Sequence, residues 1–155
     1  MPYHRKGYSV LTIKDLSITR GQGEQSFTVS LPHLSLAEGE VVSLCGSSGC
    51  GKSTLLEMMG LILKPDNLSQ YELSSDTLSM DLAPLILSNK QKTLAEIRSK
   101  NLGFMLQNGG LLPFLSVWQN ILLPCQTNGI LADESWLHHL CEKLNINHLM
   151  TKYPK

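Results

Sequence analysis

Alternating apolar and polar positions near the N-terminus predict two half-buried strands. Apolar side chains recur at close to every second residue over 10–18 and again over 27–31, the period of a strand with one face in a core. A Gly-Gln-Gly turn signal at 21–23 separates the two runs. The next apolar run, 41–45, is nearly continuous. We therefore expect it to form a strand buried on both faces of a sheet.

Longer apolar patterns predict further elements in the middle of the chain. Residues 53–63 are apolar nearly all round and stop before Pro65, which indicates a helix that other elements cover on several sides. A helical turn is expected over 94–98, and a second buried strand over 101–106. The polar stretch 66–93 supports only short elements, whose bounds the sequence does not give.

Two capping residues mark helices toward the C-terminus. Ser116 is a suitable N-cap for a helix over 117–123, which Pro124 is expected to stop. Asp133 is a suitable cap for a second helix, because an apolar stripe at helical spacing follows it at positions 136, 137, 140, 141 and 144.

The overall composition excludes several classes of function. The 155 residues carry 13 Lys and Arg against 13 Asp and Glu, so no nucleic-acid partner and no anionic-membrane surface are expected. The four cysteines form no C-x-x-C pair and have no histidine at metal-ligand spacing, which favours reduced cytosolic thiols over zinc or a disulfide framework. No secretion signal and no membrane-spanning run is found, and the length suits one soluble domain.

A phosphate-binding motif follows the apolar run at 41–45. Residues 46–53, Gly-Ser-Ser-Gly-Cys-Gly-Lys-Ser, match G-x-x-x-x-G-K-[ST]. Glycines in such a loop let backbone N–H groups approach a phosphate chain, and the following helix adds partial positive charge. Lys52 would reach the β- and γ-phosphates, while the Ser53 hydroxyl would bind Mg²⁺. The predicted contacts are Gly46, Ser47, Gly49, Cys50, Gly51, Lys52, Ser53 and Thr54.

Other classes of phosphate-loop protein fit the sequence poorly. A guanine-nucleotide site would need an N-K-x-D segment, and the segment Asn-Lys-Gln-Lys at 89–92 lacks the acid that reads the base. Small-molecule kinases use several arginines around the transferred phosphate. The three arginines here are not clustered in the sequence, so a kinase is kept only as a lesser alternative.

The motifs together resemble the ATP-binding domain of ABC transporters. The likeness covers 39–56, 60–66 and the Q-loop-like region beginning at Arg98. It implies an α/β fold, with an incomplete P-loop NTPase core and an N-terminal antiparallel β region. Within a single, partial domain over 1–155 it implies a phosphate loop at 46–54, a Q-loop region at 107–124 and the start of a helical subdomain at 133–155. Gln107 would sense the γ-phosphate and Mg²⁺, which would make Gln107 and Ser53 the metal contacts.

The resemblance also implies partners and a location. Residues 108–124 would face a membrane-embedded transporter subunit, a second ATP-binding protomer would complete the site, and the domain would lie in the cytoplasm at the inner face of a membrane. Apolar residues at 111, 112, 114 and 118 suit docking, or else cover the domain's own core. Residues 120–124 are similar to exporter-like ATPases that handle lipoproteins, macrolides or small peptides. The alternative is a stand-alone nucleotide-binding or regulatory module without hydrolysis.

One departure from the family concerns the adenine base. The family carries a base-stacking aromatic residue shortly after the first strand, whereas residues 17–20 here are Ser-Ile-Thr-Arg. Phe27 or Tyr8 could substitute for it from another position, or Arg20 could offer its planar guanidinium. The sequence leaves these alternatives open, together with weak base stacking.

A second departure concerns hydrolysis. The L-S-G-G-Q signature of the family is not in the sequence, and Asp133-Glu134, which imitates the family's acidic strand end, is expected to cap a helix instead. His138 and His139 lie on the polar side of that helix, so we expect them to be solvated and not to act as the switch histidine. The last residues resemble the family segment before the signature. We therefore expect the chain to bind Mg-ATP without hydrolysing it.

Overall fold

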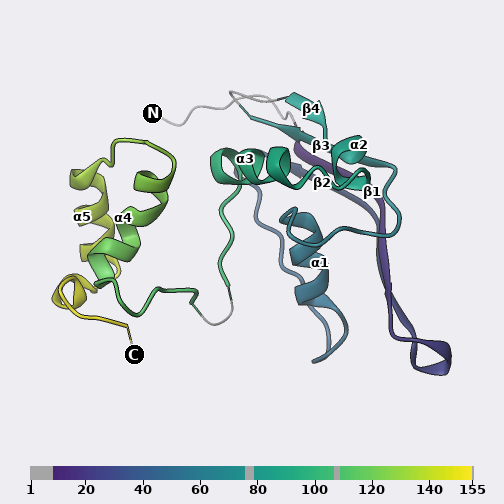
Figure 1. The fold of residues 1–155 in the computed structure, drawn as a ribbon, viewed down its shortest axis with the longest axis horizontal. Helices are drawn as coiled ribbons and strands as arrows, with labels where there is room; N and C mark the ends of the chain where they lie inside the picture. Colours follow the sequence, from purple (N-terminus) through teal and green to yellow (C-terminus); the bar gives the residue numbers. More distant parts are fainter. Residues whose placement is uncertain (1–8, 76–78, 107–108, 155) are drawn as a thin grey trace. The chain divides into compact units, whose positions relative to one another are not determined.

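The computed structural model describes residues 9–75, 79–106 and 109–154, which fall into two compact units. The first unit is Met1–Leu102 and the second is Gly103–Lys155. Helices and strands are mixed in the first unit, whereas the second contains helices only among its described residues (Figure 1). Each unit is described by itself below.

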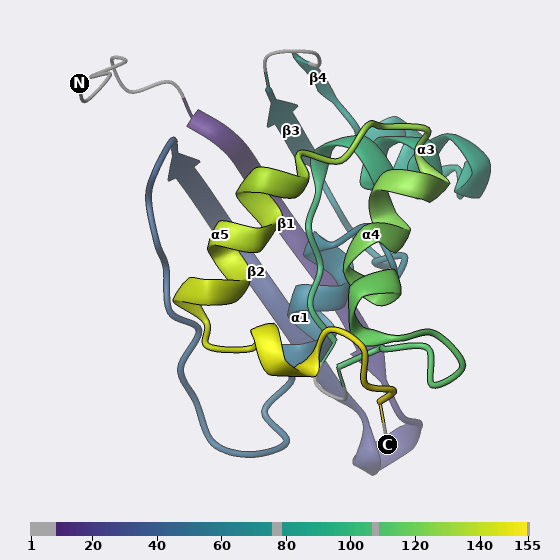
Figure 2. The same ribbon diagram turned by 90° about the vertical axis from the view of Figure 1, so that its left-hand side faces the viewer.

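A four-stranded antiparallel sheet forms the frame of the first unit. Its strand order is β2-β1-β3-β4, and β1 and β2 form a long ribbon closed by a short 3₁₀ turn, η1, at Gly23–Gln25. Figure 2 shows β1 and β2 side by side along this ribbon. The strands are β1, Ser9–Arg20; β2, Phe27–Ala37; β3, Gln70–Ser74; and β4, Ser79–Asp81. The predicted N-terminal antiparallel region is therefore confirmed.

Three helices pack with this sheet around one core. They are α1, Lys52–Met59; α2, Ala83–Leu87; and α3, Gln91–Asn101. The fully buried side chains include Ile13, Leu16, Met58, Tyr71 and Leu82. The Tyr71 hydroxyl donates a hydrogen bond to the main-chain carbonyl of Met59, and burial raises the pKa of Tyr71 well above its ordinary value. The predicted turn at 94–98 is confirmed as part of α3.

The first helix is shorter than the apolar pattern predicts. Instead of continuing to residue 63, α1 ends at Met59 with Gly60 as its C-cap. Leu61 then takes a left-handed conformation, with φ of 58°, and its side chain is buried. Its carbonyl accepts a hydrogen bond from the Arg98 guanidinium of α3. Core packing of Leu61 and this bond hold the chain in a turn that the local sequence does not favour.

The polar stretch 66–93, which the sequence left without placed elements, contributes two strands and a helix. Tyr71 and Leu73 alternate into the core from β3. Asp81 holds the end of β4, because its Oδ1 accepts the main-chain N–H groups of Tyr71 at 2.9 Å and of Ala83, the first residue of α2, at 3.0 Å. One carboxylate therefore joins a strand to a helix start, a long-range role that spacing alone does not show.

Two predicted buried strands are not strands in the structure, and these predictions were wrong. Residues 41–45 lie outside any strand and are exposed, with Val41 91% exposed. Residues 102–106 are likewise outside any strand, and Met105 is 91% exposed. A strand in the middle of a sheet needs hydrogen-bonding neighbours along both edges. Among the described residues, neither segment pairs with a strand.

The second unit contains two helices and a 3₁₀ turn. They are α4, Val117–Thr127; α5, Glu134–Lys143; and η2, Asn147–Leu149. The predicted N-cap is confirmed, because Ser116 Oγ accepts the Gln119 N–H while Gln119 Oε1 accepts the Ser116 N–H, a complete capping box. The main-chain N–H groups of Val117 and Trp118 donate to the carbonyls of Lys152 and Met150.

The predicted stop at Pro124 was wrong, since α4 continues to Thr127 with Pro124 inside it. The Thr127 hydroxyl donates to the carbonyls of Leu123 and Pro124, and the Asn128 side-chain amide donates to the carbonyl of Pro124 at 2.8 Å. These side chains close the turn after the proline. Of the helices that the structure describes, none is long and apolar enough to cross a lipid bilayer.

Candidate nucleotide-binding site

The predicted phosphate loop lies between the exposed segment 41–45 and α1. Gly51 is the N-cap of α1 and has φ of 97°, a left-handed conformation that favours glycine. A Cβ atom at Gly51 would lie 2.4 Å from Cγ2 of Val29 in β2. Glycine is therefore required here for two reasons, the backbone conformation and the close approach of the loop to β2.

The side chain of Lys52 turns back into the curve of the loop. Its ammonium donates to the main-chain carbonyls of Gly46 at 2.9 Å and Ser47 at 2.6 Å, and lies 3.7 Å from Sγ of Cys50. The positive charge therefore lies within the concave loop, on the side from which glycine backbone can approach a ligand. A point charge held in this way suits phosphate oxygens.

Backbone donors at the start of α1 complete the arrangement. No side chain caps this helix start, and the first N–H groups of an α-helix have no acceptor within the helix. Ser53 is exposed and Thr54 is half-buried, so both hydroxyls lie at this same end. Together the loop and helix offer N–H donors, a partial positive charge and one ammonium. The arrangement can hold a polyphosphate.

Comparison with known proteins agrees with this geometry. The sequence model of the ABC transporter family matches residues 30–155. The chain belongs to the ABC transporter family. Its α/β architecture also matches the solved dimeric structure of MJ0796, a bacterial ABC transporter cassette, with a TM-score of 0.69 and 26% identity over 93% of this chain and 61% of that one. The predicted resemblance and fold class are confirmed.

Curated relatives of this ABC family chain include lipoprotein-releasing system ATP-binding proteins, LolD. The chain is 33% identical to LolD of Leptospira interrogans over 92% of its own length and 55% of the relative's. It is 42% identical to LolD of Bordetella pertussis over 59% of its length and 36% of the relative's. The chain therefore spans about half the length of the curated relatives it matches.

Two other predicted features of the ABC site have different outcomes. Gln107, the predicted sensor of the γ-phosphate and Mg²⁺, lies outside the described residues. The acidic pair at 133–134 is placed as expected: Asp133 caps α5, its Oδ1 accepting the Trp136 N–H at 3.0 Å. Nowhere in the described ranges do three or more His, Cys, Asp or Glu residues gather in a way that could hold a metal ion.

The histidines of α5 are exposed, as predicted, but each is ordered by a ring contact. His138 stacks on Trp118 of α4, with ring centroids 4.6 Å apart, and His139 stacks on Trp136 at 5.6 Å.

The apolar residues at 111, 112, 114 and 118 were predicted either to form a docking surface or to cover the domain's own core, and they differ in exposure. Leu111 and Phe114 are exposed, while Leu112 and Trp118 are half-buried.

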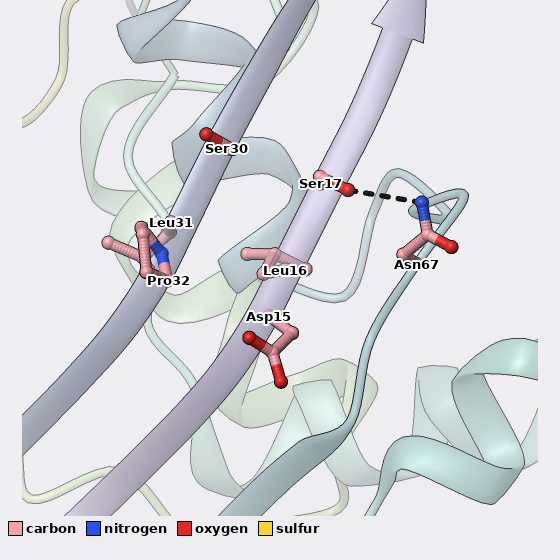
Figure 3. Close-up of a pocket in the computed structure, with 7 residues that line it drawn as sticks. All are labelled: Asp15, Leu16, Ser17, Ser30, Leu31, Pro32 and Asn67. Atoms are coloured by element: carbon pink, nitrogen blue, oxygen red, sulfur yellow. Dashed lines mark hydrogen bonds between the residues drawn. The ribbon is translucent and has the colours of Figure 1, made fainter.

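A separate pocket of about 250 Å³ on the β1–β2 ribbon does not suit a phosphate. It forms where Pro32, which has no N–H group, interrupts the ladder opposite Asp15, whose φ is 54°. Its lining contains a carboxylate and two hydroxyls but no cationic side chain (Figure 3). The residues are Asp15, Leu16, Ser17, Ser30, Leu31, Pro32 and Asn67.

The residue that sequence analysis missed at the candidate site is Val29. The sequence pattern predicts only that Val29 is an inward-facing strand residue. The structure places its side chain against Gly51. The alternation over 27–31 predicts that Val29 lies on the buried face of its strand. It does not predict that the phosphate loop packs against that face. The four cysteines are free in the structure.

Proposed function

We propose that the chain binds Mg-ATP through residues 46–54 as an ATP-binding component of an ABC transporter. One observation carries this proposal: the Lys52 ammonium lies in the curve of the loop, on the carbonyls of Gly46 and Ser47, beside an α-helix start that no side chain caps. Positive charge and free backbone donors then converge on one concave site.

Each predicted residue has a role in this proposal. Backbone N–H groups of the loop and of the start of α1 bind phosphate oxygens, and Lys52 neutralises charge on the β- and γ-phosphates. The Ser53 hydroxyl would be a ligand of Mg²⁺, and the ion would offset the negative charge of the phosphates. Gln107 is the proposed sensor of the γ-phosphate, by its resemblance to the family.

The wider role is also a proposal. In a complete cassette, ATP binding and hydrolysis would energise transport, with 108–124 facing a membrane-embedded subunit at the cytoplasmic side and a second ATP-binding protomer opposite the loop. Family membership, the LolD relatives and the dimeric state of the MJ0796 structure support this view. The alternative is a stand-alone nucleotide-binding or regulatory module without hydrolysis.

The proposal is tested by the thermal stability of the chain in the presence of Mg-ATP. A ligand at 100 times its dissociation constant stabilises a fold by about 2.7 kcal/mol. We expect such a shift in the wild type and in the control Lys64→Ala, which changes a lysine away from the loop. Lys52→Ala should lose most of the shift. A folded wild type that Mg-ATP does not stabilise would refute the proposal.

A further inference from the structure

The second unit contains a pocket of about 300 Å³ that no step of the proposed function uses. Its walls come from the start of α4, the first turns of α5 and the segment after η2 (Figure 1). All of these belong to one unit, so the pocket is defined within it. Its volume is at the lower end of ligand pockets and suits one side chain or a ligand of similar size. The lining residues are Ser116, Trp118, Glu134, His138, Met150 and Thr151.

Hydrogen bonds and a ring contact hold the walls of this pocket together. The main-chain N–H of Val117 donates to the carbonyl of Lys152 at 2.8 Å, and that of Trp118 donates to the carbonyl of Met150 at 3.0 Å. Across the helices, the Trp118 indole stacks on the His138 imidazole with an interplanar angle of 18°. The aromatic wall is therefore ordered before any ligand arrives, which lowers the entropic cost of binding.

The charge of the lining selects the kind of ligand. Glu134 contributes the one carboxylate among the lining residues, and none of them is a lysine or an arginine. Glu134 is the first residue of α5 and His138 lies one turn later, so their side chains share a face of the helix. A carboxylate attracts a cation, and the face of an indole ring does so as well. The pocket therefore favours a cationic group over a neutral or anionic one.

We propose that this pocket receives an arginine side chain from the membrane-embedded partner subunit. The inference rests on the proposed function, in which 108–124 face such a subunit, and adds the chemistry of the contact. A guanidinium is planar, stacks on aromatic rings and donates two parallel hydrogen bonds to a carboxylate, so it matches the ring stack and Glu134 better than a lysine ammonium does. Cytoplasmic loops of membrane proteins carry an excess of Lys and Arg. Arginine is also enriched among the residues that contribute most to the affinity of interfaces.

The first test titrates the full, ¹⁵N-labelled chain with N-acetyl-arginine amide and with N-acetyl-citrulline amide, which has nearly the same shape but no charge. NMR reads the indole N–H signals of the two tryptophans, Trp118 and Trp136. We expect the arginine compound to shift the Trp118 signal saturably, and the citrulline compound to bind about threefold more weakly. Trp136, which does not line the pocket, should not respond. Equal affinities for the two compounds, or no shift of Trp118, would overturn the inference.

Two matched variants assign the preference to one carboxylate. Glu134→Gln keeps the shape of the side chain and removes its charge, so it should weaken binding of the arginine compound about threefold and abolish the preference over citrulline. Glu142→Gln changes another exposed glutamate of α5 that does not line the pocket, and it should leave both affinities unchanged. A preference that survives in Glu134→Gln, or an equal loss in both variants, would contradict the proposal.

A third experiment identifies the source of the arginine. A photo-reactive benzoylphenylalanine replaces Thr151, which lines the pocket and is exposed, and the full chain is crosslinked in cells that express it. Mass spectrometry of the product should identify a peptide that contains arginine and belongs to a membrane-spanning protein. A crosslink only to soluble proteins would overturn the assignment of the partner.

The outcomes distinguish this inference from the proposed function. Lys52-dependent stabilisation by Mg-ATP, together with no preference for arginine, overturns the role of the pocket alone. A preference for arginine in a folded chain that Mg-ATP does not stabilise overturns the proposed function and, with it, the identity of the partner. A Trp118 signal that moves with protein concentration in the wild type but not in Glu134→Gln would place a second copy of the chain in the pocket, and would also overturn the inference.

Discussion

Two segments of the first unit that the sequence predicts as strands differ completely in burial. In β1, Ile13 and Leu16 are at most 1% exposed, whereas in the segment 41–45 Val41 is 91% exposed and Leu44 is 42% exposed. The difference is the neighbours: β1 has β2 on one edge and β3 on the other, while 41–45 pairs with no described strand. An apolar run becomes a buried strand only where other segments supply both the ladder and the cover.

The sharpest test makes the same substitution in both runs. Leu16→Ala removes a buried side chain and should lower the free energy of unfolding by about 2–5 kcal/mol. Leu44→Ala should change it by about 0.5 kcal/mol, because the side chain is already largely hydrated. Urea unfolding followed by far-UV circular dichroism measures both. Equal losses would show that 41–45 is buried in solution.

The stability of the fold at alkaline pH tests whether Tyr71 is buried in the core of the first unit. The pKa of Tyr71 is raised by burial, so the folded chain keeps its proton where the unfolded chain, with a pKa near 10, loses it. The stabilisation is complete below pH 10 and is lost above it, at up to about 1.4 kcal/mol per pH unit. Unfolding measured from pH 8 to 11 should show this slope.

Two conservative variants control that measurement. Tyr71→Phe should remove the slope, and Tyr153→Phe, at an exposed tyrosine, should keep it. A slope that survives in Tyr71→Phe would assign the effect to another group.

A smaller effect is expected from the cap of α4, whose stability is local. Ser116→Ala removes the acceptor of the Gln119 N–H and should destabilise the second unit by about 1 kcal/mol. Both tryptophans of the chain lie in this unit, so their fluorescence reports its unfolding. Ser135→Ala, inside α5 and exposed, is the control. An effect of equal size in both variants would argue against the capping box.

The smallest change in folding stability is expected in the exposed run itself. Val41→Lys should alter the free energy of unfolding by no more than about 0.5 kcal/mol. It should nevertheless reduce any self-association of the chain, since a charge on an exposed apolar segment opposes strand pairing between molecules. Light scattering against protein concentration measures this. Unchanged association would mean that another surface holds the molecules together.

Local rules predicted the parts of the chain that local interactions decide. Ser116 and Asp133 cap the helices that follow them because a cap bonds within three residues of itself. The β1–β2 ribbon followed from alternation and one turn. The stop predicted at Pro124 was wrong: α4 runs through it, and side chains after it, Thr127 and Asn128, close the next turn.

Other parts depended on partners far away in the sequence. The elements of 66–93 are short, and Asp81 organises two of them through bonds to Tyr71 and Ala83. The early end of α1 depends on Leu61 and on Arg98, 37 residues later. No pattern within a short window contains these contacts, so sequence reasoning could not place them.

By itself the sequence determined the family, the antiparallel ribbon and the loop over 46–54, since glycine, lysine and serine at fixed spacing set backbone freedom and charge within a few residues. Only the tertiary structure decided that 41–45 lies exposed and that Gly51 packs on Val29. These outcomes depend on burial and strand register, which are properties of segments brought together by folding.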